Sequence, residues 1–268
     1  SLFTMSQLAS MASAPVVCNG GRAGSWQMEV WNLAGAFLGH VEVGTITPKK
    51  QLGNPKPRIF RLEKDKAMIN RLGFNNHGAD VIASRIEKIK PDGILGVNIG
   101  PNKDSLNKLE DYLTALTSLH HISDYITINI SSPNTEGLRD FHNKDLMQNL
   151  FNQINKLKSL KKIKKPLVIK ISPDIDDKNI SEIIELILKF KIDGVIISNS
   201  SDGNRQNLSD KNKLENGGLS GEPIRDISTK LIKKFYKEIK NKIYIIGVGG
   251  VDSGNNAFDK LTAGANAV

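Results

Sequence analysis

The sequence contains little cysteine and no long apolar segment. Its 268 residues include a single cysteine, Cys18, which excludes an internal disulfide framework and any metal site built from several cysteines. No apolar run approaches the roughly 20 residues that a membrane-spanning helix needs. The opening residues 1–17 are small and weakly apolar but have no charged leader, which is not typical of a secretory signal. These absences favour a globular protein of a reducing compartment.

The overall composition is that of an ordered globular domain. Hydrophobic residues make up 39% and charged residues 24% of the chain, close to the averages for folded proteins. Barrels of alternating strands and helices commonly reach about 250 residues without splitting into domains. We therefore expect residues 1–268 to form one domain, with an atypical N-terminal segment at residues 1–28.

The chain is basic, with a formal net charge of +9. Many of its lysines fall in residues 156–165 and 230–240, on what we interpret as the outer faces of helices. Such clusters are typical of solvated helix surfaces, and we predict no nucleic-acid partner. A basic exterior would also suit an anionic membrane surface, and the charge alone does not decide between these interpretations.

From about residue 40 onward, short β-branched runs alternate with longer segments of helical periodicity. This order predicts repeated strand-helix units and a parallel sheet. The predicted strands are residues 40–45, 94–99, 125–130, 167–171, 194–198, 243–248 and 265–268. Segments with apolar residues at helical spacing lie between them, at residues 82–89, 106–116, 146–157, 180–187 and 224–235.

The predicted fold is an α/β barrel of the TIM type, (β/α)8. Nearly continuous apolar strands such as residues 195–197 indicate burial on both faces, as in a barrel covered by helices. The region before residue 40 should hold the first strand, but residues 18–26, CNGGRAGSW, form a glycine-rich stretch without alternation. We therefore expect a degenerate first strand and a last strand that is cut short at residue 268.

Polar residues recur at the ends of the predicted strands. In a parallel barrel the functional groups gather where strands end and loops begin. A single amide at such a position is usually a satisfied structural group, but several strands converging on one mouth indicate a ligand with many polar edges. The residues in question are Thr45, Asn98, Asn129, Lys170, Ser198, Asn199 and Ser200.

The most specific motif is NISSPNTEGLR, residues 129–139. It places two amides and two hydroxyls within a few residues of the end of a buried strand. Ser131 and Ser132 could merely stabilise the loop by hydrogen bonds. A serine can act as a base only where the site carries its proton away.

Two further loops carry weaker signals. Residues 70–76, NRLGFNN, contain several amides and a glycine before a helix, where Asn75 or Asn76 could simply cap that helix. The segment IIGVGGVDSG places glycines after a strand, with Asp252 or Ser253 positioned to cap the next helix. Its backbone N–H groups could bind a phosphate, and a purely structural glycine-rich turn is the alternative.

Taken in order, these motifs resemble the dihydroorotate dehydrogenase family, and specifically its quinone-dependent class. The resemblance runs from about Gly39 to Val268. It implies an FMN-binding α/β barrel that oxidises dihydroorotate to orotate in de novo pyrimidine biosynthesis. The matching stretches are GHVEVGTITPKKQLGNPKPRIFRL, INRLGFNNHG, GVNIGPNKD, NISSPNTEGLR, VIKISPD, NGGLSGEP and IIGVGGVDS.

The resemblance implies roles for individual residues. Ser132 would remove the C5 proton of dihydroorotate while hydride passes to FMN, and serine rather than cysteine at this position implies the membrane-associated class. Lys170 would stabilise negative charge on the reduced flavin. The implied substrate-binding residues are Asn70, Arg71, Leu72, Gly73, Phe74, Asn129, Asn134, Asn199 and Ser200. The implied FMN-binding residues are Thr45, Asn98, Asn129, Lys170, Ser198, Gly221, Gly249 and Gly250.

The two ends of the chain depart from the family pattern. The family's first loop, of the type AAGxDK, supplies a lysine, whereas the aligned stretch CNGGRAGSWQMEVWN has none. Either Arg22 substitutes for that lysine or the site is impaired. The chain also stops at Val268, before the tyrosine and small hydroxyl residue that complete the phosphate site. Residues 1–15 show no counterpart of the helices that form the quinone tunnel.

The resemblance also implies partners and a location. They are dihydroorotate and orotate, a quinone, and a peripheral contact with the cytoplasmic side of the cell's inner membrane, or a cytoplasmic location if the membrane-binding helices are absent. Two alternatives stay open: an inactive or impaired remnant of the same family, and an FMN oxidoreductase that acts on another dihydropyrimidine.

Overall fold

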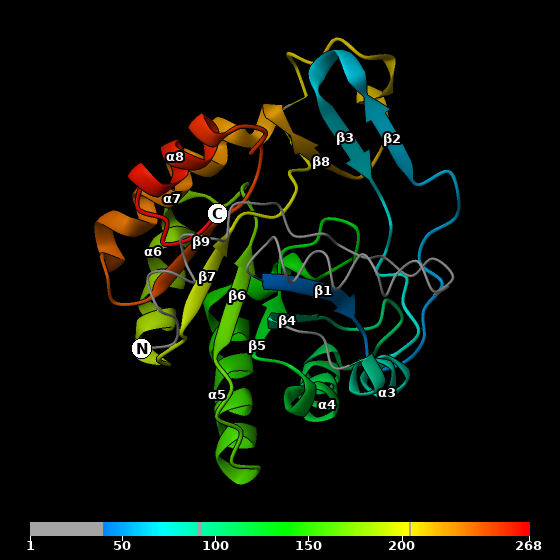
Figure 1. Ribbon diagram of the computed structural model, residues 1–268, viewed down its shortest axis with the longest axis vertical. Coiled ribbons are helices and arrows are strands. Elements are labelled where there is room, and N and C mark those ends of the chain that lie inside the picture. Colours follow the sequence, from blue (N-terminus) through cyan, green and yellow to red (C-terminus); the bar gives the residue numbers. More distant parts are fainter. Residues whose placement is uncertain (1–39, 90–92, 204) are drawn as a thin grey trace.

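The computed structural model describes residues 40–89, 93–203 and 205–268 (Figure 1). The glycine-rich stretch of residues 18–26, with Cys18 and Arg22, lies outside these residues, as does the region predicted to hold a first strand. The predicted roles of these segments therefore stay predictions.

The main sheet has six parallel strands. Their β-branched sequences explain why they form the centre of the molecule, since most residues of these strands are buried. In spatial order they are β1 (His40–Ile46), β4 (Ile94–Ile99), β5 (Tyr125–Asn129), β6 (Leu167–Ile171), β7 (Gly194–Ile197) and β9 (Tyr244–Gly247). These strands confirm the corresponding sequence predictions to within a residue at most ends.

The predicted strand at residues 265–268 is not formed as a strand. Only one parallel bridge, between Ile246 and Ala267, continues the sheet beyond β9. In the described part of the chain the parallel sheet therefore does not close on itself.

Of the six described helices, five connect neighbouring parallel strands and the sixth follows β9, and all six pack against one another in chain order around the outer side of the sheet (Figure 1). The apolar stripes of the five connecting helices face the large core between helices and sheet. None of the helices in the described ranges is long and apolar enough to cross a membrane. They are α3 (Ala79–Ile89), α4 (Lys108–Leu119), α5 (Lys144–Leu160), α6 (Asp177–Lys189), α7 (Arg225–Ile239) and α8 (Gly254–Thr262).

A second, antiparallel sheet was not predicted from the sequence. It consists of β2 (Ile59–Leu62), β3 (Ala67–Asn70) and β8 (Gly218–Gly221), and Figure 1 shows it at the top of the molecule. Each strand has four residues, and β8 contains two glycines and a serine, so neither length nor alternation marks them as strands. The antiparallel pairing of β3 with β8, which includes Ile69 opposite Leu219 far along the chain, completes this sheet.

Candidate functional site

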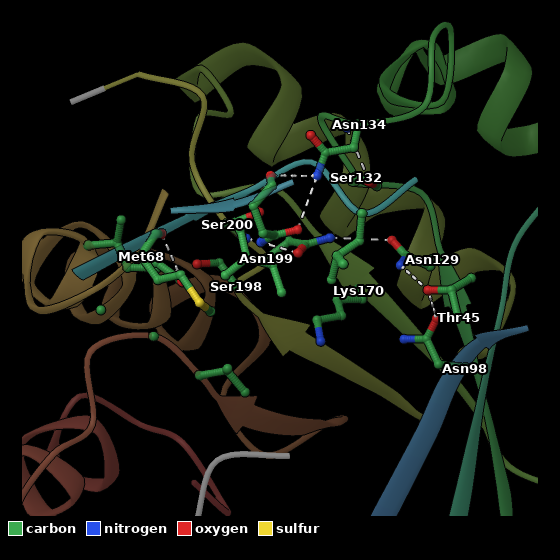
Figure 2. Close-up of a pocket in the computed structure, with 18 of the residues that line it drawn as sticks. Thr45, Met68, Asn98, Asn129, Ser132, Asn134, Lys170, Ser198, Asn199 and Ser200 are labelled. Atoms are coloured by element: carbon green, nitrogen blue, oxygen red, sulfur yellow. Dashed lines mark hydrogen bonds between the residues drawn. The ribbon is translucent and has the colours of Figure 1, made fainter. Parts of the chain in front are cut away.

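A cavity of about 1510 Å³ lies where the carboxyl ends of the parallel strands meet the small sheet. The main sheet and its loops contribute polar side chains from β1, β4, β5, β6 and β7. The small sheet contributes Met68 and Asn70 from β3, and Ser220 and Gly221 from β8. Figure 2 shows that the labelled side chains come from separate strands and from the loops that follow them, and that they converge on one space.

Almost every predicted site residue lines this cavity. The set comprises Thr45, Asn70, Leu72, Gly73, Phe74, Asn98, Asn129, Ser132, Asn134, Lys170, Ser198, Asn199, Ser200, Gly221, Gly249 and Gly250. Arg71 is the exception: its guanidinium donates to Glu215 at 2.8 Å and lies 4.5 Å from the ring centre of Phe60. Arg71 therefore supports the small sheet from outside the cavity wall.

A chain of hydrogen bonds fixes the amides at one end of the cavity. The Thr45 hydroxyl donates to Asn98 Oδ1 at 2.8 Å and accepts from Asn129 Nδ2 at 2.8 Å. The amide of Asn98 donates in turn to Glu42 Oε1 at 3.0 Å. Because all four side chains are buried, these bonds set the orientation of each amide before any ligand arrives.

Glu42 is a functional candidate that the sequence reasoning missed. Its carboxylate is 6% exposed and accepts from Thr127 Oγ1 at 2.7 Å and from Tyr125 Oη at 3.3 Å. Burial raises the pKa of Tyr125 well above its ordinary value, so this phenol stays a donor. The signal in the sequence was an acidic residue inside the otherwise apolar strand β1.

Lys170 projects from β6 into the cavity, and among the described residues its counter-charge is Glu42. Its ammonium lies 3.9 Å from Glu42 Oε1, and the lysine side chain is 11% exposed. A buried ammonium is stable only with compensating negative charge or acceptors. Glu42 supplies part of this compensation, and the donors of Lys170 remain directed at the cavity.

The two serines of the NISSPNTEGLR loop have different environments. Ser131 Oγ donates to Asn129 Oδ1 at 3.2 Å and accepts from Asn199 Nδ2 at 2.9 Å, so it ties β5 to the loop after β7. Ser132 lines the cavity and accepts one bond, from the Asn134 backbone N–H at 3.2 Å. Within the described residues the Ser132 hydroxyl donates to no protein group, which leaves its proton available. The loop-stabilising role considered for both serines thus fits Ser131.

Asn134 joins the same loop to the small sheet. Its Nδ2 donates to the Asn70 backbone carbonyl at 3.0 Å and lies 3.3 Å from Asn70 Oδ1. Asn70 is the last residue of β3. The two amides, which are separated by 64 residues in the chain, therefore reach the cavity as one unit.

Arg139 connects the Ser132 loop to the loop after β7, and sequence reasoning assigned it no role. Its Nε donates to the Ser131 carbonyl and its Nη2 to the Ser200 carbonyl, both at 3.2 Å. The same guanidinium pairs with Asp174 at 3.2 Å and with Asp202 at 2.7 Å. Five donors in one rigid plane allow these simultaneous contacts.

The two carboxyls beside Arg139 titrate differently. Burial raises the pKa of Asp174, and a hydrogen bond with Asp202 adds to this effect. Burial also acts to raise the pKa of Asp202, but hydrogen bonds from Asp174 and Arg139 lower it overall. Asp174 is therefore the first of the pair to bind a proton as the pH falls.

Glycines form the wall at the far end of the cavity. Gly221, Gly249 and Gly250 have φ values of +102°, +114° and +68°. A Cβ on Gly250 would lie 2.7 Å from Arg225 Cβ, and one on Gly221 would lie 2.4 Å from the Lys66 carbonyl oxygen. Only glycine fits these positions, and the backbone N–H groups there are accessible to a ligand.

The end of this glycine loop begins helix α8. The Ser253 side chain accepts from the Asn256 N–H at 3.2 Å and caps the helix. Of the two residues predicted to cap it, Asp252 and Ser253, the serine does so. Asp252 instead pairs with Arg225 at 3.4 Å. The loop is thus held to both α7 and α8.

Several buried polar atoms lack a partner within the described part of the chain. They include Ser198 Oγ and Asn75 Oδ1, whose residues line the cavity, and Thr135 Oγ1 in the Ser132 loop. Buried polar groups are nearly always hydrogen-bonded, so such atoms indicate positions where a ligand or water completes the site. Asn76, in contrast, accepts from Gly78 N–H at 2.8 Å and orders the turn before α3.

Comparisons with known proteins identify relatives along most of the chain. The family model described as "Dihydroorotate dehydrogenase" matches residues 11–268. A protein of Bartonella henselae named "Dihydroorotate dehydrogenase (quinone)" is 43% identical over 236 residues, which are 86% of this chain and 65% of that protein. A protein of the same name from Buchnera aphidicola is 44% identical over 237 residues, 86% of this chain and 70% of that protein.

The structural comparison gives the same result. The crystal structure of DHODH from Eimeria tenella in complex with ferulenol superposes with a TM-score of 0.84 and 37% identity, covering 88% of this chain and 70% of that one. The α/β barrel class and the family resemblance predicted from the sequence are therefore confirmed. The chain spans about 65% of the length of the Bartonella henselae relative.

Proposed function

Since the chain belongs to the dihydroorotate dehydrogenase family, we propose that it oxidises dihydroorotate to orotate, with FMN as hydride acceptor and a quinone as final electron acceptor, in de novo pyrimidine biosynthesis. One observation carries the proposal: Ser132, Asn70, Lys170 and Asn199 come from separate segments and line the same cavity. We also propose that the FMN site lies within a single domain formed by the whole chain.

The residues of the cavity fit FMN. The glycine wall at Gly221, Gly249 and Gly250 offers backbone N–H groups to a phosphate. The oriented amides of Asn98 and Asn129 and the unpartnered Ser198 hydroxyl offer hydrogen bonds to a polar ring edge. When bound, FMN supplies the hydride acceptor, and the Lys170 ammonium is available to stabilise negative charge beside it.

The substrate would lie between this site and the small sheet. Asn70, Asn134, Asn199 and Ser200 offer both donors and acceptors, which suits the carbonyls, ring N–H groups and carboxylate of dihydroorotate. Their linked positions would hold the flat ring in one orientation, and positioning of this kind lowers the barrier to transfer. Ser132 Oγ would take the C5 proton as it releases its own hydroxyl proton to water in the cavity, since it donates to no protein acceptor among the described residues.

A quinone partner and a peripheral contact with the cytoplasmic side of the cell's inner membrane form part of the proposal. The support is the name of the relatives, which specifies a quinone, and the net charge of +9. Lys56, Arg58 and Lys66 line the cavity next to the small sheet and would favour anionic molecules near its entrance.

The test is a flavin spectrum of the purified chain after reconstitution with FMN. We expect the visible flavin absorbance to appear, to bleach when dihydroorotate is added without oxygen, and to return when a soluble quinone is added. Failure to bind FMN would refute the proposal. Equal bleaching by dihydrouracil would instead favour an oxidoreductase that acts on another dihydropyrimidine.

A further inference from the structure

Lys260 is a buried cation that the proposed chemistry does not use. It lies on α8, is 0% exposed, and donates to Ser228 Oγ at 3.1 Å and Thr229 Oγ1 at 3.2 Å. Among the described residues no carboxylate oxygen lies within 4.0 Å of its ammonium. Burying a charge without a counter-ion is unfavourable, so its retention needs an explanation.

The Lys260 side chain lies directly behind the glycine wall of the cavity. A Cβ on Gly247 would be 3.2 Å from Lys260 Cβ, and a Cβ on Gly249 would be 3.3 Å from Ser228 Cβ. Gly247 and Gly249 both line the cavity. The ammonium is therefore one layer of atoms behind the loop at which a phosphate would bind.

The local helix gives no reason to place a cation here. Ser228 and Thr229 lie in the first turns of α7 (Arg225–Ile239), and the N-terminal end of a helix carries partial positive charge. The charged groups that face Lys260 are Arg225 and Asp226 on α7 and Asp259 on α8, while Gly247 of β9 has no side chain. Arg225 is itself paired with Asp252 and Glu222.

We propose that Lys260 is a positioning residue that stabilises the phosphate of a bound flavin mononucleotide from behind the glycine loop at residues 247–250. This inference rests on the proposed function and deepens it by assigning a residue to the recognition of the phosphate. In the alternative, Lys260 only organises α7, and its loss would weaken all flavin binding equally.

The comparison of FMN with riboflavin, which lacks the phosphate, separates these two roles. The second pKa of a phosphate monoester is about 6, so FMN is a dianion at and above about pH 7. Burial, followed by repulsion from Arg225, lowers the pKa of Lys260 to about 8. A bound dianion would raise that pKa, so phosphate-dependent affinity should be complete below pH 8 and decline as the pH rises through the pKa of the complex.

The experiment measures the dissociation constants of both flavins for the full chain between about pH 7 and about pH 9.5. We expect the ratio of FMN affinity to riboflavin affinity to fall by about 3- to 10-fold over this range, the size expected of one screened charge pair. In Lys260→Met the ratio should already be about 10-fold lower at neutral pH and should not change with pH. In Lys260→Arg, whose side chain stays charged, the ratio of FMN affinity to riboflavin affinity should stay high over the whole pH range.

Lys158→Met is the matched control. Lys158 on α5 is half-buried, and burial lowers its pKa as it does that of Lys260. It donates to the Lys165 carbonyl at 2.9 Å, outside the set of cavity-lining residues. Its replacement should leave the ratio unchanged at every pH.

The possible outcomes separate the inference from the proposed function. If FMN binds but the ratio is independent of pH in the unmodified chain, the inference is wrong, whether or not Lys260→Met folds. An equal loss of affinity for both flavins in Lys260→Met would also overturn it and would assign the lysine to structure alone. A chain that binds neither flavin would refute the proposed function and the inference together.

Discussion

The six-stranded parallel sheet and the three-stranded antiparallel sheet both line the cavity, but they supply different things. The parallel strands are buried along most of their length and end in oriented polar groups, such as Asn98, Asn129 and Lys170. The small sheet has a separate apolar cluster around Ile69 and Leu219. It closes the opposite side of the cavity with Met68 and Asn70 of β3 and Ser220 and Gly221 of β8.

The parallel sheet therefore supplies the polar groups of the proposed chemistry, and the small sheet encloses the cavity. The parallel sheet belongs to the large core, which includes residues of five of the six described helices, α3 to α7, so its strand ends are held firmly. The cluster of the small sheet contains only five buried residues, and regions with few buried contacts open more readily. Substitutions in the parallel sheet and in the small sheet should therefore have different effects on activity and stability.

The largest effect is expected from Ser132→Ala. Removal of a general base typically costs about 10²- to 10⁴-fold in rate, while FMN binding should be unchanged because the flavin contacts lie elsewhere in the cavity. Rapid-mixing measurement of flavin reduction by dihydroorotate would show this loss.

Ser132→Cys is the informative companion, because a thiol is also a competent base. Ser132→Cys should recover part of the rate of flavin reduction, and the dependence of that rate on pH should change. Unchanged reduction in Ser132→Ala would remove the proposed base and show that the parallel sheet does not supply this step.

The next largest effect compares Ile169→Ala in β6 with Ile69→Ala in β3, both fully buried. Cavities left by Ile→Ala typically destabilise a protein by about 2–5 kcal/mol. In denaturant unfolding, we expect the loss of stability in Ile169→Ala to lie at the upper end of this range. The loss in Ile69→Ala should be about 2 kcal/mol, because the small cluster around Ile69 can relax. Equal losses would mean that the two sheets unfold as one cooperative unit.

Arg139→Lys should separate the binding of flavin from the alignment of the substrate. Lysine keeps the charge but cannot contact Ser131, Ser200 and both aspartates at once. We expect kcat for dihydroorotate to fall by about 10-fold, with a smaller change in the dissociation constant of FMN.

Arg85→Lys, on the exposed face of α3, is the matched control and should change neither quantity. An equal loss of FMN and dihydroorotate binding in Arg139→Lys would indicate that the arginine stabilises the whole cavity rather than the alignment of the two loops.

The smallest effect concerns the cations beside the small sheet. In Lys66→Gln we expect kcat/KM for the anionic substrate to fall by about 2- to 3-fold at low ionic strength and to match the unmodified chain at high salt, because surface charges are screened. A loss that persists at high salt would place Lys66 in direct contact with the substrate.

Much of the fold was predictable from the sequence because the parallel strands and their helices carry strong local signals. The strands β4 and β6 begin and end at the predicted residues, since apolar runs bounded by turn residues and amphipathic helices are recognised without tertiary information. Polar residues at the strand ends, such as Asn98, Asn129 and Lys170, followed from their place in the pattern, whereas the remaining site residues and the individual roles followed from the resemblance to the family. The carboxyl ends of neighbouring parallel strands lie at the same edge of the sheet whatever the details of packing.

The small sheet, the Glu42 network, the Arg139 contacts and the buried Lys260 depended on tertiary structure. Each one joins residues that are remote in the chain, as in the pairing of Ile69 with Leu219 and the hydrogen bond from Asn98 to Glu42. Local sequence carries no record of such pairings, because their stability comes from burial and hydrogen bonding that exist only after the chain has folded. The sequence thus determined which polar residues stand at the end of each parallel strand. The folded structure decided which charged residues, such as Glu42 and Lys260, became buried around the cavity.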